Sequence, residues 1–141
     1  NKKNLNSSLL IINGDSFSNI NIKKFIKTFF TEKKNLIAFS HVNDTKRYGN
    51  FKIIGTKIIK QLHKNKSGWI NNGYYLLNKN SIRKLSYYSS LEKDLINKLN
   101  YSFNISAFKV MNDNFVDIGT TNDYFKFIEN VKKFKNKKQN Y

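Results

Sequence analysis

The chain has 141 residues, enough for one domain with a hydrophobic core but hardly for two. Its 39% hydrophobic and 15% aromatic content argues against general disorder, and the absence of cysteine excludes disulfides and thiolate metal sites. Because no apolar run approaches the length of a membrane span and no signal-peptide pattern is found, we expect a cytoplasmic protein without a membrane partner.

The net charge of +17 makes a nucleic-acid-binding module one alternative. Of the 26 basic residues, however, only Arg47 and Arg83 are arginine, the side chain that makes bidentate contacts to phosphate and guanine. Lysine, asparagine and isoleucine are frequent and proline is absent, as an AT-rich coding sequence would produce. We therefore expect lysines spread over several faces and no specific nucleic-acid partner.

The first predicted element is the run Leu9–Ile12, whose four aliphatic residues without polar alternation predict a strand buried on both faces. Asn13 and Gly14 then permit a turn, and Asp15 follows the carboxyl end of the strand, where open α/β sheets place their ligands. Asp15 is either a turn residue or a ligand with partners elsewhere. Because a core strand begins so early, we expect an N-terminal portion to be missing.

A helix and a second buried strand come next. Residues 22–32 carry apolar side chains at 22, 25, 26, 29 and 30, which is helical spacing, and 35–40 predict the strand. A strand, a helix and a strand within about thirty residues predict a βαβ unit with a parallel strand pair. We therefore expect an α/β fold with a mixed, mostly parallel sheet flanked by helices.

The second half of the chain predicts short strands and helices. They are a hairpin over 51–59 turning at Gly55-Thr56, a strand over 69–77, a helix over 90–99, short strands over 105–110 and 114–117, a last helix with apolar positions from 124 to 134, and a basic, frayed tail over 135–141.

Only nine residues are acidic, so their placement is informative. Asp117 follows a predicted strand with a glycine close behind, as Asp15 does, and two such carboxylates could converge on one Mg²⁺. The alternative for Asp117 is a cap before the last helix, a role that Thr120 or Thr121 fills better. Glu92 lies in the first turn of a predicted helix, where the helix dipole alone favours an acidic residue.

Six short motifs follow one another along residues 9–130. They are LLIINGDS from Leu9, Arg47-Tyr48-Gly49, His63-Lys64, Asn71-Asn72-Gly73, SLEKD from Ser90 and FVDIGT from Phe115. In this order they resemble the sugar-1-phosphate nucleotidyltransferases, most closely the mannose- and heptose-1-phosphate guanylyltransferase-like members. Two positions depart from the family pattern, because His63 replaces an acidic residue and Asn72 adds an amide.

The resemblance implies a Rossmann-like nucleotide-diphospho-sugar transferase fold. It also implies an enzyme that joins an NTP (GTP or CTP) to a sugar 1-phosphate, releasing pyrophosphate, for surface polysaccharide or glycan precursor synthesis. In the family's terms Asp15 and Asp117 are catalytic residues that bind Mg²⁺ as cofactor. The sugar phosphate would be contacted by Gly49, Lys64, Asn71, Gly73 and Glu92.

The family's glycine-rich nucleotide-binding loop has no counterpart in this chain and would lie before Asn1. The resemblance therefore implies a partial nucleotidyltransferase domain over 1–134, holding the sugar-phosphate and metal half, with 135–141 as a basic tail. Such a chain is expected to be inactive by itself. A non-catalytic sugar-phosphate-binding domain is the second alternative, and self-association is left open.

Overall fold

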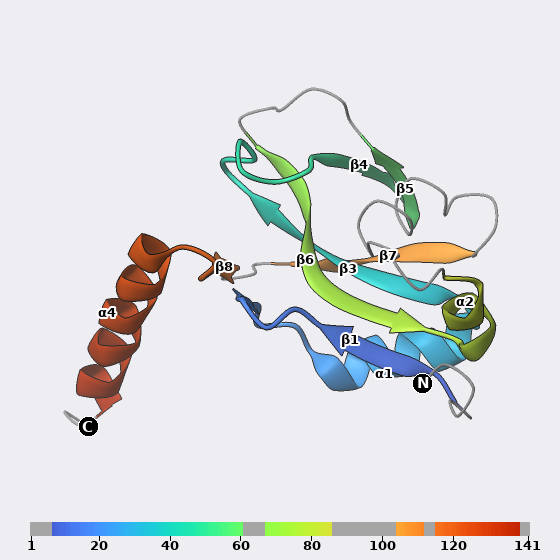
Figure 1. Cartoon of the computed structure of the whole chain (residues 1–141), viewed down its shortest axis with the longest axis horizontal. Coiled ribbons are helices and arrows are strands. Elements are labelled where there is room, and N and C mark those ends of the chain that lie inside the picture. Colours follow the sequence, from blue (N-terminus) through green and yellow to red (C-terminus); the bar gives the residue numbers. More distant parts are fainter. Residues whose placement is uncertain (1–6, 61–66, 86–103, 112–114, 139–141) are drawn as a thin grey trace.

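The computed structural model describes residues 7–60, 67–85, 104–111 and 115–138. A mixed sheet forms its centre (Figure 1), with strands in the order β5-β4-β6-β3-β7 and with β1 also paired to β6. The elements are β1 (Leu9–Ile12), β2 (Ser16–Phe17), α1 (Ile22–Glu32), β3 (Asn35–Val42), β4 (Phe51–Ile54), β5 (Lys57–Lys60), β6 (Gly68–Leu77), α2 (Lys79–Lys84), β7 (Ile105–Val110), β8 (Val116–Asp117) and α4 (Thr121–Lys138).

The predicted α/β class with a mixed sheet and flanking helices is confirmed. The expected parallel majority is wrong for the described strands, because only β3 and β7 pair in parallel. The predicted βαβ unit is also corrected. β1 and β3 run in the same direction, but β6 lies between them and is antiparallel to both.

Strand β1 is less buried than its sequence predicts. Ile12 is 49% exposed, and the other residues of β1 are half-buried. The strand pairs with β6 from Leu9↔Leu77 to Ile12↔Tyr74 and with no other described strand. Leu9 and Ile11 pack on one face of the sheet and Leu10 on the other, so an aliphatic run also suits a strand that is paired along one edge only. Composition alone therefore does not place a strand at the centre of a sheet.

The core lies on both faces of the sheet because β3 alternates between them. Ile37 and Phe39 pack on one face, and Leu36 and Ala38 pack on the other. Helix α1 covers the second face with its apolar stripe, and its first turn is capped by the Asn21 side chain, which accepts a hydrogen bond from the Lys24 N–H at 2.9 Å. The predicted bounds of this helix are confirmed.

Strand β6 contains an irregularity at its middle. Ile37 of β3 pairs with Tyr75, but Phe39 pairs with Asn71, so β6 carries extra residues between these pairs. Gly73 lies there with φ +84°, and the Asn71 side chain bridges the irregularity by accepting the Gly73 N–H at 3.0 Å. The two amides and the glycine that interrupt this apolar strand therefore form a bulge.

Three further expectations have clear outcomes. The hairpin with Gly55 at its turn is confirmed as β4 and β5. Helix α4 continues to Lys138, so the first part of the expected frayed tail is helical. The helix predicted over 90–99 lies outside the described residues, and none of the helices in the described part is both long and apolar enough to cross a membrane.

Candidate functional site

The short sheet of β2 and β8 brings together two aspartates that are distant in sequence. Asp15 immediately precedes β2, and Asp117 ends β8 opposite Ser16. The Ile118 N–H donates to the Asp15 carbonyl at 2.8 Å, and this hydrogen bond holds together the backbone segments that carry the two aspartates. Figure 1 shows β8 leading directly into α4, so the beginning of that helix lies at the same edge.

The two carboxylates approach each other beside Gly119. A β-carbon at Gly119 would lie 2.9 Å from Asp117 Oδ1 and 3.5 Å from Asp15 Oδ2. The two oxygens are therefore separated by no more than the sum of these two distances. Only a glycine leaves this space open, and its N–H donates to Asp117 Oδ1 at 2.8 Å. The structure thus brings the carboxylates of Asp15 and Asp117 together at one place.

A guanidinium group lies against this pair. Arg47, from the loop between β3 and β4, donates through Nη2 to Asp117 Oδ2 at 3.3 Å and through Nη1 to Asp123 Oδ2 at 2.5 Å. The hydrogen bond with Asp123 raises the pKa of Arg47 above its usual value. Arg47 therefore remains fully charged and joins the loop to the start of α4.

Asp123 is positioned by the first turn of α4. Its N–H donates to Thr120 Oγ1 at 3.3 Å, which is an N-cap contact, and its Oδ2 accepts from the Thr120 hydroxyl at 2.6 Å. The Thr120 hydrogen bond and, after it, Arg47 lower the pKa of Asp123. Its carboxylate is ionised at neutral pH and favoured by the positive end of the helix dipole.

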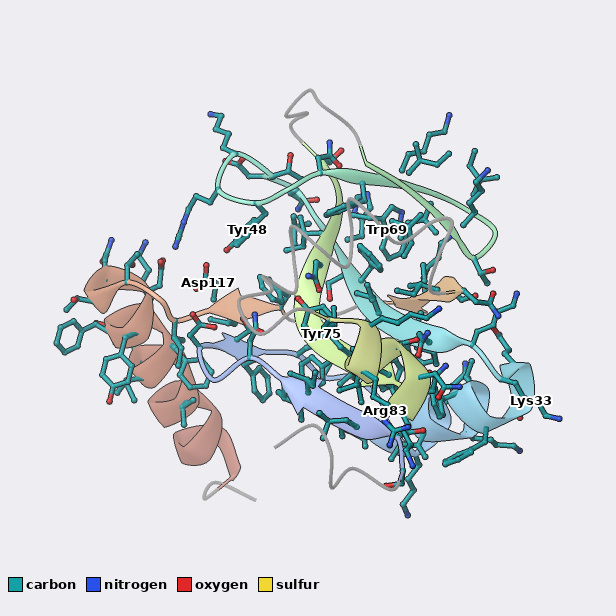
Figure 2. The ribbon with its side chains drawn as sticks, turned by 45° about the vertical axis from the view of Figure 1, so that its right-hand side comes forward. Lys33, Tyr48, Trp69, Tyr75, Arg83 and Asp117 are labelled. Atoms are coloured by element: carbon teal, nitrogen blue, oxygen red, sulfur yellow. The ribbon has the colours of Figure 1, made fainter. Side chains whose placement is uncertain are left out.

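Tyr48 completes this group of side chains. Figure 2 shows Tyr48 and Asp117 near each other, on the loop after β3 and on β8. The Tyr48 ring lies 5.6 Å from the Phe115 ring and under the Arg47 guanidinium at 5.8 Å. Burial raises the pKa of the Tyr48 hydroxyl, and the negative charge of Asp117 raises it further. The hydroxyl is thus neutral at physiological pH and can donate or accept a hydrogen bond.

The two carboxylates at this edge suit a hard divalent cation that takes its remaining ligands from water and substrate. Across the described residues, no group of three or more histidine, cysteine, aspartate or glutamate side chains could hold a metal ion. Mg²⁺ commonly takes one or two carboxylates and completes its shell with water and substrate phosphate. Asp15 is exposed and Asp117 is 19% exposed, so an ion between them would remain open to substrate.

Of the other predicted site residues, Gly73 lies nearest to this edge, because its carbonyl accepts a hydrogen bond at 2.9 Å from the N–H of Asn13, two residues before Asp15. The Asn71 amide donates to the Tyr75 hydroxyl at 2.5 Å, and Gly73 shapes the bulge in β6. Gly49 is exposed beside Tyr48, and a β-carbon there would lie 3.3 Å from the Phe51 ring. Lys64 and Glu92 lie outside the described residues. The substrate-binding roles of these residues stay predictions.

Asp123 and the pairing role of Arg47 are functional features that the sequence-based predictions did not include. A signal for Asp123 was present, because Thr120-x-x-Asp123 has the spacing of a capping box. No local signal indicates that Arg47 reaches two carboxylates more than sixty residues away, since that contact depends on the fold.

A family model for nucleotidyl transferases matches residues 1–133. Two curated relatives are D-glycero-alpha-D-manno-heptose 1-phosphate guanylyltransferases. The protein from Campylobacter jejuni is 28% identical over 123 residues, which are 85% of this chain and 54% of the relative. The protein from Aneurinibacillus thermoaerophilus is 28% identical over 135 residues, which are 89% of this chain and 56% of the relative. The chain thus spans about half the length of these relatives.

Solved structures agree with the family model. HddC from Yersinia pseudotuberculosis superposes with a TM-score of 0.72 and 29% identity over 92% of this chain and 58% of its own. The same protein complexed with GMP-PN gives a TM-score of 0.73 with 29% identity, covering 89% of this chain and 56% of that one. A UTP-bound UGPase from Acinetobacter baumannii, at 16% identity and a TM-score of 0.69, shares the fold over 88% of this chain and 50% of its own.

Proposed function

The chain belongs to the nucleotidyl transferase family, and on that premise we propose that the Asp15–Asp117 edge is the metal-binding part of an enzyme that joins a nucleoside triphosphate to a sugar 1-phosphate. The observation that carries the proposal is the close approach of these two carboxylates, which come from opposite ends of the chain and meet beside Gly119. A purely structural turn or cap would not need both carboxylates at one place.

The charge of the reactants explains why such an edge is useful. A sugar phosphate oxygen attacks the α-phosphorus of the triphosphate, and two polyanions must meet for this to happen, so positioning and neutralisation dominate the catalysis. A divalent cation would supply the neutralising charge when bound. Asp15 and Asp117 would hold it, Arg47 would face the same phosphates, and Lys64 would offset the charge of the sugar phosphate.

We take GTP and a heptose 1-phosphate as the substrates, and pyrophosphate and a nucleotide-activated heptose as the products. Both curated relatives carry the name of a heptose 1-phosphate guanylyltransferase, which supports GTP over CTP. Asn71, Gly73 and Glu92 would select sugar hydroxyls, and Gly49 would approach the sugar through its backbone. Because nucleoside triphosphates are cytoplasmic, the reaction would take place there and supply surface glycan synthesis.

The proposal is tested by pyrophosphate release from the complete gene product that contains these residues. GTP, CTP, UTP and dTTP are each offered with heptose 1-phosphate, mannose 1-phosphate and glucose 1-phosphate, with and without Mg²⁺. We expect Mg²⁺-dependent release that is fastest with GTP and the heptose or mannose phosphate. Release with no sugar phosphate present, or none with any pair, would contradict the proposed function.

A further inference from the structure

Arg47 is bound unequally by its two carboxylates. The contact to Asp123 is 2.5 Å, whereas the contact to Asp117 is 3.3 Å, at the outer limit of a hydrogen bond. The side chain is 49% exposed, and its guanidinium also lies over the Tyr48 ring at 5.8 Å. Asp123 is therefore the main anchor of the guanidinium, and Asp117 is a weaker second partner.

The anchor itself is rigid. Asp123 exchanges two hydrogen bonds with Thr120 in the first turn of α4, and its side chain is only 20% exposed. The Tyr124 N–H also bonds to the Thr120 carbonyl at 2.9 Å, so the turn is closed by the backbone as well. A carboxylate fixed in this way keeps Arg47 in place even when the partner at Asp117 is exchanged.

On these contacts we infer that Asp123 is a positioning residue. It holds the Arg47 guanidinium beside the Asp15–Asp117 pair, where the guanidinium supplies positive charge when no divalent cation is bound. This inference rests on the proposed cation site at that pair. Asp15, Asp117 and Asp123 carry three negative charges, and among the described ion pairs only Arg47 opposes them. Without a divalent cation, Arg47 neutralises Asp117 and limits the repulsion between the two neighbouring aspartates.

A divalent cation and Arg47 compete for Asp117. When the cation binds, the long contact from Arg47 Nη2 is given up, and the short contact to Asp123 remains. The freed Nη2 then faces the same edge, where a phosphate group would lie. Arg47 therefore opposes cation binding, whereas Asp123 favours it in two ways, by adding negative charge and by keeping Arg47 from pairing with Asp117 alone.

The test is a double-mutant cycle on Mn²⁺ affinity, measured by calorimetry or by electron paramagnetic resonance on the complete gene product without nucleotide. Arg47→Met should tighten Mn²⁺ binding and Asp123→Asn should weaken it, each by about two- to fivefold, the range that an exposed ion pair supports. In the Arg47→Met background, Asp123→Asn should have a clearly smaller effect, because Asp123 acts mainly through Arg47. Asparagine keeps an oxygen that can accept from Thr120, so the helix cap survives the substitution.

Glu129→Gln is the matched control, because it removes one carboxylate from the exposed face of the same helix and should leave Mn²⁺ affinity unchanged. If both single variants weaken binding, or if their effects simply add, the inference is wrong although the cation site stands. If the wild-type protein binds no Mn²⁺, or if Asp117→Asn does not change binding, the cation site and this inference both fall. Tight binding with no nucleotidyl transfer would overturn the proposed reaction alone.

Discussion

Replacing Gly119 by alanine should disable the carboxylate pair while leaving the fold almost intact. Gly119 does not have a positive φ, so its backbone accepts an alanine. The added methyl group would lie 2.9 Å from Asp117 Oδ1, well inside normal contact distance, and 3.5 Å from Asp15 Oδ2. Asp117 must therefore turn away, and it then loses its 2.8 Å hydrogen bond from the Gly119 N–H.

The size of the effect follows from that hydrogen bond. A hydrogen bond to a charged acceptor contributes roughly 1.5–3 kcal/mol, and the partial exposure of Asp117 places the loss of stability near the lower end, at about 1.5 kcal/mol. Cation binding should suffer more, because the displaced oxygen is one of the proposed ligands. We expect Mn²⁺ affinity to fall at least about tenfold, which corresponds to 1.4 kcal/mol.

The assay compares Gly119→Ala with Gly14→Ala, by Mn²⁺ titration and by urea unfolding of the complete gene product. Gly14 immediately precedes Asp15, and a β-carbon there meets nothing within 4 Å, so this control should bind Mn²⁺ like the wild type. Wild-type affinity in Gly119→Ala would refute the reasoning, because it would show that the position of Asp117 Oδ1 is immaterial. An equal loss in both variants would point to backbone stiffening instead.

Three further predictions concern single residues. Asp117→Asn should reduce kcat for pyrophosphate release at least about a hundredfold with little change in the unfolding midpoint, since the lost charge acts mainly in the transition state. Unchanged kcat in this variant would show that Asp117 is not a metal ligand. Gly73→Ala should lower the free energy of unfolding, measured in urea, by about 2 kcal/mol or more, because Gly73 has φ +84° and a β-carbon there would lie 2.8 Å from the Asn13 side chain. Gly55→Ala is the control, since Gly55 has φ +58° in open space, and it should lower the free energy of unfolding by only about 1 kcal/mol. Equal losses in the two variants would contradict the packing argument. Because Thr120 and Arg47 lower the folded-state pKa of Asp123, its contribution to stability is present above the unfolded pKa of about 4 and is lost as the pH falls through the lower folded value. Asp123→Asn should therefore destabilise at pH 7, and the difference from wild type should shrink as the pH falls below about 4; a difference that stays constant as the pH falls would refute it.

The sequence predicted the elements of this fold better than their arrangement. Periodicity identified α1 and the β4–β5 hairpin because both are determined by local spacing and turn residues. The position of β6 between β1 and β3 is determined by contacts far apart in the chain, so a strand–helix–strand pattern could not reveal the inserted strand. The uniformly aliphatic composition of β1 predicts a central strand, although Ile12 is half exposed.

The strand predicted over 69–77 is confirmed as β6, but its buried polar residues concealed its central position in the sheet. Asn72 in β6 is fully buried, and its amide donates to Ser40 at 2.9 Å and to Ser18 at 3.3 Å. Such a residue weakens the apolar pattern of the strand, and its partners are known only from the fold. At the site, the position of Asp15 and Asp117 after predicted strands indicated both residues. The contact of Arg47 with Asp117 could not be predicted from local sequence, because the two residues are distant in the chain.

The central claim is that Asp15 and Asp117 together hold a divalent cation at the β2–β8 edge. The most direct measurement is an anomalous difference map from crystals of the complete gene product grown with Mn²⁺ and collected at the manganese edge. We predict one strong peak within about 2.0–2.4 Å of a carboxylate oxygen from each aspartate, with Arg47 withdrawn from Asp117 and still bound to Asp123. An empty map between the two aspartates in crystals saturated with Mn²⁺ would contradict the claim.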